Sequence, residues 1–273
     1  AIASGLLNRG VITGEQIFVS GPNLNRLQRW SAMGAFCRTD NGEVVDNSDI
    51  IFLCVKPHVL GLCAAQIKSS HVPSTKDKDK LFISVLAGVK LNILENSFSF
   101  IDGLKIFRVM PNTSVQIAEG CTVFTPGSRV VQKDVEKLHF IFSAVGTAEQ
   151  VREEDIEAIT AMTGCGPAYV YTFLEALIDG GVKQGVPRQM ATTFAAQTLL
   201  GAAKTVLLTR KHPAVLKDEV CSPGGATICG IHELEKGCFR STVINAIENA
   251  TKRTIELGKK SAEILSSKDN AQQ

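Results

Sequence analysis

The sequence predicts two regions of different fold class: an α/β region with a parallel sheet, followed by an all-helical region. In the first half, short β-rich runs alternate with stretches of helical apolar spacing, which is typical of βαβ units. From Glu153 onward no stretch has a convincing strand pattern. We therefore expect a boundary near Val151, with an α/β domain over residues 1–150 and a helical domain over residues 151–273.

The individual elements follow from local patterns. Two continuous apolar runs, 49–55 and 81–86, are typical of strands that are buried on both faces. Further strands are expected at 16–20, 105–110, 121–124 and near Glu149, with helices at 25–33, 59–68, 91–97 and 133–144 between them. In the second half, apolar spacing predicts helices at 168–184, 188–209, 225–236 and 241–267. Proline is well tolerated at a first helical position, where Pro167 and Pro187 stand.

Composition argues against several function classes. The 273 residues are 44% hydrophobic and 21% charged, which is near the globular average. Aromatic residues make up only 6% and the net charge is +2, so we expect no nucleic-acid partner. No apolar run reaches the roughly 20 residues that span a bilayer, so no membrane partner is expected. The five histidines show no metal-ligand spacing, and we expect no metal.

The eight cysteines include no Cys-x-x-Cys pair. Cys54, Cys63, Cys165 and Cys229 lie in apolar or small-residue stretches, which favours reduced core thiols over disulfides. Reduced thiols indicate a reducing compartment.

The beginning of the chain lacks a feature that the α/β pattern leads us to expect. A dinucleotide-binding fold of the Rossmann type has a G-x-G-x-x-G/A turn between its first strand and first helix. That turn is absent, and residues 1–7 already have the pattern of a helix interior without an N-cap. Two interpretations stay open: a Rossmann-type fold whose first strand and turn are missing, or a different α/β fold that never had the turn.

Polar or small residues follow several predicted strands, where ligands of doubly wound sheets bind. The segment after the strand at 16–20 has no acidic residue, whereas Ser20, Asn23 and Arg26 could meet a 2′-phosphate, which favours NADP(H) over NAD(H). An ordinary turn is the alternative for this segment. Lys56 and Asn112 end two further strands, and each of them alone could simply be a solvated residue.

The turn at residues 222–227, Ser-Pro-Gly-Gly-Ala-Thr, precedes a predicted helix. A helix N-terminus with free N–H groups binds carboxylate or phosphate, and two glycines let a ligand approach the backbone. Thr227 adds a hydroxyl on the first helical turn. The alternative is simple capping of the helix by Ser222. The turn at 163–169 has the same build, whereas Glu153, Glu154 and Asp155 indicate a solvated helix start.

Several of these segments, in order, resemble the pyrroline-5-carboxylate reductase family. Residues 163–169 are similar to that family's S-G-S-G-P-A-Y, residues 179–188 to D-G-G-V-K…G-L-P-R, and residues 197–204 to Q-T-L-L-G-A-A-K. Residues 222–227 match S-P-G-G-[AT]-T, and residues 55–57 and 110–113 match V-K-P and M-P-N-T. The likeness extends from Ala1 to about Lys260.

The resemblance implies a Rossmann-type domain, a helical dimerisation domain, a homodimer and larger rings of dimers. It implies reduction of Δ1-pyrroline-5-carboxylate to L-proline by NAD(P)H, with Thr227 as the catalytic hydroxyl that bonds the ring nitrogen. The implied substrate-binding residues are Glu219, Ser222, Gly224, Gly225, Ala226 and Thr227. The implied cofactor-binding residues are Ser20, Gly21, Asn41, Cys54, Val55, Lys56, Pro57, Val85, Leu86, Ala87 and Asn112.

The sequence departs from the family pattern at four places. The first strand and its glycine-rich turn are missing, Ser114 replaces a proline, Cys165 replaces a serine, and Glu219 stands where many members have Asn. A carboxylate at Glu219 could repel the anionic substrate. Loss of a central strand exposes two strand edges, so we expect residues 1–273 to bind NADPH weakly.

We therefore expect a pyrroline-5-carboxylate reductase that favours NADPH, in the cytoplasm or the mitochondrial matrix. A dehydrogenase for another small acid is a second possibility, because the Rossmann-type half is widely shared; the Pro-Gly-Gly-Ala-Thr turn argues against it. A non-catalytic dimerising remnant of the family is a third possibility, because the cofactor turn is missing.

Overall fold

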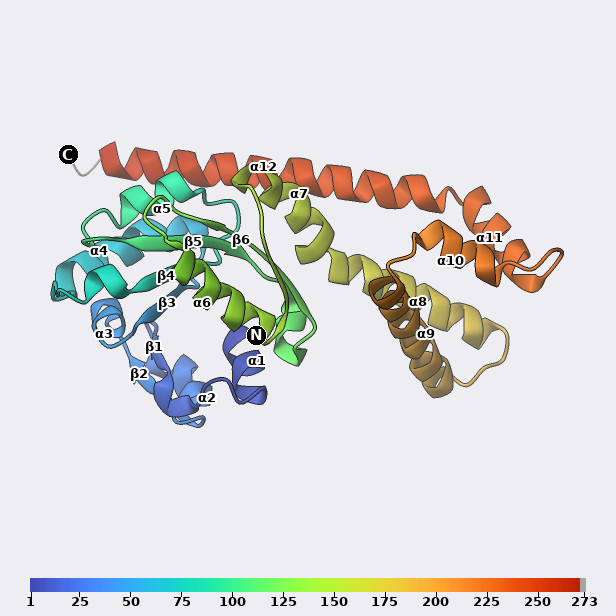
Figure 1. Ribbon diagram of the computed structural model, residues 1–273, viewed down its shortest axis with the longest axis horizontal. Helices are drawn as coiled ribbons and strands as arrows, with labels where there is room; N and C mark the ends of the chain where they lie inside the picture. Colours follow the sequence, from blue (N-terminus) through green and yellow to red (C-terminus); the bar gives the residue numbers. More distant parts are fainter. Residues whose placement is uncertain (271–273) are drawn as a thin grey trace. The chain divides into compact units, whose positions relative to one another are not determined.

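The computed structural model describes residues 1–270, whose contacts form two compact units (Figure 1). The first unit comprises Ala1–Gly164 together with the last helix from Ala250 on, and the second comprises Cys165–Asn249. This grouping differs from the expected division into residues 1–150 and 151–273. Residues 153–164 stay with the sheet because Arg108 forms ion pairs with Glu153 and Glu157.

The last helix joins the first unit at a contact between two glycines. A Cβ atom on Gly88 would lie 2.8 Å from the Cα atom of Gly258, closer than such atoms can approach. Gly88 also has φ = +75°, a conformation that L side chains rarely adopt. The absence of side chains at both positions therefore allows this close packing of the two backbones.

The main sheet has five strands in the order β3 (Ile50–Leu53), β4 (Leu81–Ser84), β5 (Lys105–Met110), β6 (Gly120–Pro126) and β7 (Gly146–Gln150). The first three strands are parallel, as expected, but β6 is antiparallel to β5. Only residues 111–119 connect β5 to β6, whereas a parallel crossover needs roughly a dozen residues or more. The sheet is therefore mixed rather than wholly parallel.

A second, two-stranded parallel sheet contains β1 (Phe18–Ser20) and β2 (Phe36–Arg38). Within residues 1–270, β1 pairs only with β2 and β3 pairs only with β4. Each of β1 and β3 therefore leaves one edge without a strand partner among the described residues. The sequence patterns did not predict β2.

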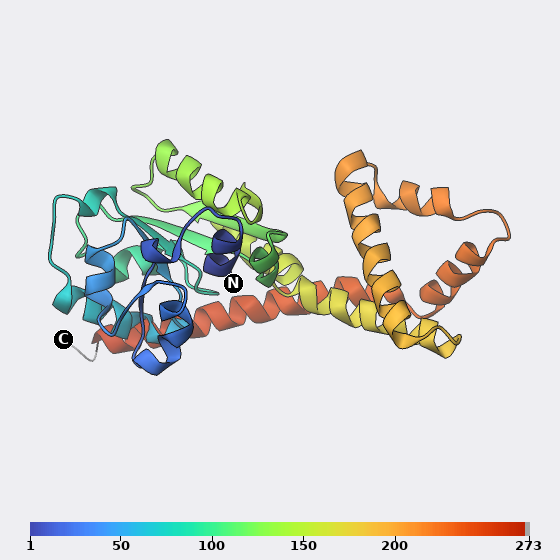
Figure 2. The same ribbon diagram turned by 90° about the horizontal axis from the view of Figure 1, so that it is seen from below.

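Helices cover both faces of the main sheet (Figures 1 and 2). One core contains residues of α3 (Asn41–Asp46), α4 (Leu60–Ser70) and α5 (Leu91–Ser97), and the other contains residues of α1 (Ile2–Asn8) and α6 (Gln132–Ser143). Alternate residues of β4 enter opposite cores: Phe82 packs into the first, and Leu81 and Ile83 into the second. The continuous apolar runs thus mark strands with two buried faces, as expected.

Short helical segments connect these elements. They are η1 (Gly14–Gln16), η2 (Leu24–Leu27), α2 (Gln28–Ser31), η3 (Pro57–Val59), η4 (Asp77–Asp79), η5 (Thr113–Ile117), η6 (Glu153–Asp155), α7 (Ile156–Ile159) and the π-helix η7 (Thr160–Gly164).

The second unit is helical, as predicted. It contains α8 (Gly166–Lys183), α9 (Arg188–Thr209), α10 (Pro213–Val220), α11 (Ala226–Lys236) and the beginning of α12 (Phe239–Asn270). The short helix α10 was not predicted. Among the described residues of this unit, only Ala191 and Ala195 are buried hydrophobic residues. No helix of the described chain is both long and apolar enough to cross a membrane.

The cysteines are all free. The expectation of core thiols is correct for Cys63 but wrong for Cys54 and Cys229, which are exposed, while Cys165 is half-buried. Cys54 directly follows β3 at the sheet edge, and Cys229 lies on the largely unburied helix α11, so their apolar neighbours in sequence do not enclose them.

A buried histidine ties the loop before β4 to helix α3. The Nδ1 atom of His71 lies 2.5 Å from Oδ1 of Asp46, and its Nε2 atom lies 3.0 Å from Oδ2 of Asp77. His71 and Asp77 are both buried. The imidazole thus bridges the side chains of Asp46 and Asp77, one at each ring nitrogen.

We predict that His71→Leu lowers the free energy of unfolding by about 3 kcal/mol, because it leaves the buried Asp77 carboxyl without this partner and also removes the contact with Asp46. The single tryptophan, Trp30, lies in the first unit, so its fluorescence reports urea unfolding there. The urea concentration at the midpoint of unfolding should be lower by about 1 M in His71→Leu than in the wild type. The exposed His58 provides the control, and equal midpoints for His71→Leu and His58→Leu would refute this role.

Candidate active site

Three of the predicted cofactor segments meet at one edge of the main sheet. Leu53 at the end of β3 pairs with Ser84 of β4, and Ser84 pairs with Arg108 of β5. Because these strands are parallel, residues 54–57 and 85–87 both follow the carboxyl ends of their strands and lie at the same end of the sheet. Strand β5 continues for two residues beyond Arg108, to Met110, and the segment that contains Asn112 follows it at the same end of the sheet.

The exposure of these residues differs along the edge. Cys54, Lys56 and Ala87 are exposed, whereas Val55, Pro57, Val85 and Asn112 are half-buried. Leu86 is 4% exposed and its side chain belongs to the core, so that side chain packs inside the protein. Desolvation by surrounding protein atoms raises the pKa of the Cys54 thiol, although the residue as a whole is exposed.

A second group of predicted residues lies at the end of β1. The hydroxyl of Ser20 donates to Oδ1 of Asn41 at 2.6 Å, and Nδ2 of Asn41 donates to Oε1 of Gln66 at 2.7 Å. Gly21 follows directly and donates its N–H to the carbonyl of Arg38. Ser20 and Asn41, which are 21 positions apart in sequence, therefore form a preassembled neutral pair.

Sequence reasoning missed Asp40, which holds Asn41 in place. Its Oδ1 accepts hydrogen bonds from Ser70 Oγ and from the backbone N–H groups of Gly42 and Glu43, so it caps α3. The hydrogen bond from Ser70 and those from the backbone lower the pKa of the Asp40 carboxyl, against a smaller opposing effect of burial. The signal that could have found it is the Asp-Asn-Gly-Glu pattern of a capping sequence at residues 40–43.

The turn before α11 has the geometry of an anion site. The N–H of Gly225 donates to the carbonyl of Ser222, and Gly224 has φ = +68°. Gly225 is the N-cap of α11 and no side chain caps the helix, so the predicted alternative of capping by Ser222 is wrong. A Cβ atom on Gly225 would lie 2.3 Å from Oγ of Ser222 and 3.2 Å from its carbonyl oxygen, so the turn is tightly packed at this glycine.

The uncapped N–H groups at the beginning of α11 are available to a ligand. Ala226 and Thr227 occupy the first two helical positions and are exposed. The hydroxyl of Thr227 has no hydrogen-bond partner within the described chain. Both the backbone donors and this hydroxyl thus lie on one helical turn.

Glu219 lies near this turn, three residues before Ser222, at the end of α10. Its Oε1 atom lies 2.6 Å from Nζ of Lys211, and each side chain is about half exposed. The ion pair offsets the negative charge of Glu219, so the repulsion expected from the sequence is weakened.

The turn at residues 163–169 contains a helix distortion and a thiol. The π-helix η7 ends at Gly164, and α8 begins at Gly166 with Pro167 as its second residue. Desolvation, with a smaller contribution from Cys165, raises the pKa of the Tyr169 hydroxyl. The thiol that replaces the family serine therefore interacts with Tyr169.

The prediction for the segment 153–155 is partly wrong. Glu153 accepts a hydrogen bond from the N–H of Leu91 at 2.7 Å and pairs with Arg108, so it is a structural anchor rather than a solvated residue. Glu154 and Asp155 do form surface pairs with Arg152. No cluster of three or more potential metal ligands occurs among the described residues.

The described residues fit part of a dinucleotide. Ser20 and Asn41 supply neutral hydrogen-bonding groups at one end, and the small residue Ala87 leaves room at the sheet edge. The sequence contains no glycine-rich turn of the G-x-G-x-x-G/A type to cradle the diphosphate.

Two family models match the chain. Residues 1–88 match a model described as NADP oxidoreductase coenzyme F420-dependent, and residues 153–257 match one described as pyrroline-5-carboxylate reductase dimerisation. The two matches fall in the α/β half and the helical half of the chain, so both halves have recognisable relatives.

Curated relatives match nearly the whole chain. Pyrroline-5-carboxylate reductase from Arabidopsis thaliana is 42% identical over 94% of this chain and 91% of the relative. The enzyme of that name from Methanosarcina acetivorans is 41% identical over 95% of this chain and 94% of the relative.

Solved structures agree with the sequence relatives. A crystal structure of Plasmodium falciparum pyrroline carboxylate reductase with NADP bound has a TM-score of 0.82 and 33% identity, covering 94% of this chain and 93% of that one. A pyrroline-5-carboxylate reductase from Coxiella burnetii has a TM-score of 0.81, 31% identity and the same coverage. By fold and sequence, this chain belongs to the pyrroline-5-carboxylate reductase family.

Proposed function

We propose that this chain reduces Δ1-pyrroline-5-carboxylate to L-proline by hydride transfer from NAD(P)H, the last step of proline biosynthesis. The observation that carries the proposal is the turn before α11, whose backbone N–H groups are not capped by a side chain and where Thr227 is the second helical residue. The names of the relatives and their identity over nearly the whole chain support it.

The substrate carboxylate binds the backbone N–H groups at the beginning of α11, near Gly225 and Ala226. A helix N-terminus favours an anion because its N–H groups are unpaired and its dipole is positive there. Ser222 and Gly224 shape the turn, and Glu219 lies beside it in its ion pair with Lys211.

Thr227 orients the imine nitrogen of the substrate. Its hydroxyl can donate to a neutral imine or accept from the N–H of a protonated one. Reduction adds a hydride to the imine carbon and leaves a proton on nitrogen, which solvent supplies. Thr227 thus holds the nitrogen through both states without carrying a charge of its own.

The nicotinamide supplies the hydride when the cofactor is bound. Within this chain, residues 54–57 and 85–87 line the sheet edge that receives the cofactor, and Ser20, Gly21 and Asn41 bind its adenosine end. These residues orient the cofactor, and orientation alone can lower the barrier by several kcal/mol.

We expect the full-length protein to oxidise NADPH only when pyrroline-5-carboxylate is present, which loss of absorbance measures. Thr227→Ala should lower kcat by about tenfold to a hundredfold, because the hydroxyl contacts the reacting nitrogen. Thr147→Ala, at an exposed position of β7, is the control. An unchanged kcat in Thr227→Ala would remove Thr227 from the mechanism, and a folded but inactive wild type would favour a non-catalytic dimerising protein.

We also propose a preference for NADPH over NADH. The end of β1 presents the neutral pair of Ser20 and Asn41, and the segment 20–26 contains Arg26 but no carboxylate. NAD-preferring folds place an acidic residue at this point to bind the ribose hydroxyls, whereas a 2′-phosphate is repelled by it.

Ser20→Asp should therefore lower kcat/KM for NADPH by about tenfold relative to kcat/KM for NADH. Ser31→Asp introduces the same charge at an exposed position of α2 and should leave the ratio unchanged. A constant ratio in Ser20→Asp would show that this residue does not meet the 2′-phosphate.

The helical unit supports assembly into a homodimer. Among its described residues, only two alanines are buried hydrophobic residues, whereas many large apolar side chains are exposed. Phe194 and Leu207 of α9 are 61% and 75% exposed. Such a surface is too apolar for a free monomer, and a second copy of the chain would bury it. Dimers of the family's kind could assemble further into rings.

Light scattering should give at least twice the chain mass for the full-length protein. Phe194→Asp should shift the measured mass toward that of the monomer. Burying an unpaired carboxylate in an apolar interface costs more free energy than the apolar contacts there contribute. Gln197→Asp, at an exposed polar position of the same helix, serves as the control. An unaltered mass for Phe194→Asp with unchanged helix content would place the interface elsewhere.

A further inference from the structure

Strand β5 has one row of side chains that all touch the segment 153–164. Arg108, Met110 and Asn112 alternate with Val109 and Pro111, so they point to the same side of the strand and its extension. Each of the three contacts a different part of that segment. The row therefore joins the sheet to the last residues of the first unit.

Arg108 makes the deepest of these contacts. Its side chain is 3% exposed, and its guanidinium lies 3.1 Å from Oε1 of Glu153 and 2.8 Å from Oε1 of Glu157. Glu153 also binds the N–H of Leu91. A buried cation with two carboxylate partners is costly to rearrange, so it holds η6 and α7 against β5.

Met110 and Asn112 contact the π-helix η7. A Cβ atom on Gly164 would lie 3.1 Å from Cε of Met110, so the glycine allows a close approach. The Nδ2 atom of Asn112 donates to the carbonyl of Thr163 at 3.2 Å. Thr163 lies in the last turn of the helix, where carbonyl groups lack an intrahelical donor.

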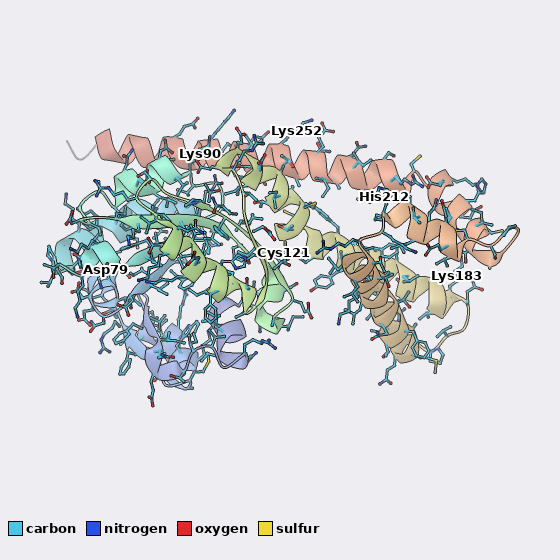
Figure 3. All side chains as sticks on the ribbon, viewed as in Figure 1. Asp79, Lys90, Cys121, Lys183, His212 and Lys252 are labelled. Carbon is cyan, nitrogen blue, oxygen red and sulfur yellow. The ribbon has the colours of Figure 1, made fainter. Side chains whose placement is uncertain are left out.

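The other end of the Asn112 amide is also occupied. Its Oδ1 atom accepts a hydrogen bond from the N–H of Cys121 at 3.2 Å, near the start of β6. Figure 3 labels Cys121, the second residue of β6, which follows the short connection from β5. Asn112 therefore links η7 to both neighbouring strands, and its donor and acceptor atoms both have protein partners.

We propose that Asn112 is a positioning residue, which holds the π-helix η7 at the carboxyl end of β5, the same end of the sheet at which the proposed cofactor segments 54–57 and 85–87 begin, instead of binding the cofactor itself. This inference rests on the proposed reductase activity. A π-helix is a rare element that occurs frequently at functional sites. The hydrogen bond to Thr163 anchors η7 at the end of the sheet where segments 54–57 and 85–87 follow their strands.

The test is Asn112→Asp in the full-length protein. This change keeps the acceptor for Cys121 and replaces the donor to Thr163 with an oxygen that repels the carbonyl. We expect kcat for pyrroline-5-carboxylate reduction to fall by about tenfold to a hundredfold. The Kd for NADPH, measured by fluorescence titration without substrate, should stay within about twofold of wild type.

Hydrogen exchange supplies a readout that does not depend on activity. Amides of residues 160–168 should exchange faster in Asn112→Asp than in wild type, because the π-helix loses its anchor. Gln116→Glu makes the same amide-to-carboxylate change at an exposed position of η5 and should alter neither exchange nor kcat. Asn112→Ala removes the donor without adding a charge and should act in the same direction if Asn112→Asp fails to fold.

A raised Kd for NADPH with unchanged kcat and unchanged exchange would overturn the proposal and make Asn112 a cofactor ligand. Wild-type kinetics and exchange in both variants would overturn it as well. If the folded wild type shows no turnover, the proposed reductase activity fails, while faster exchange in the variants would still establish the anchoring of η7 by Asn112.

Discussion

The shared direction of β3, β4 and β5 is the constraint on which the rest of the site depends. Their register places the ends of three strands side by side, so residues that are up to 60 positions apart lie along one edge. The crossover helices of these parallel strands, α4 and α5, both pack into the first core, whereas α1 and α6 pack into the second. The pairing that brings the polar strand ends together thus also builds the first core beside them.

Charged groups buried in the first unit act at opposite ends of this sheet. His71 bridges Asp46 and Asp77 before β4, and Arg108 bridges Glu153 and Glu157 on β5. Buried ion pairs contribute little net stability, but removing one partner is costly. Their effect is to specify one arrangement: the first holds a loop against α3, and the second keeps residues 153–164 with the sheet.

The two units differ in how they are stabilised. The α/β unit has two cores, whereas the described helices of the second unit bury almost no large apolar side chain. The exposed apolar side chains of the second unit and its match to a dimerisation family model both support the homodimer that we propose. The turn before α11, which we propose binds the substrate, belongs to this unit, and its local geometry rests on its glycine conformations.

The sequence by itself determined the two-part fold, most strands and the helices α8, α9, α11 and α12, because apolar periodicity records which faces are buried. It also identified the turn at 222–227, whose glycines and proline have local conformational meaning. Only the tertiary structure decided the antiparallel direction of β6, the role of Glu153 as an anchor and the use of both ends of the Asn112 amide. These features depend on partners 9 to 62 positions away, and a local pattern carries no information about such contacts.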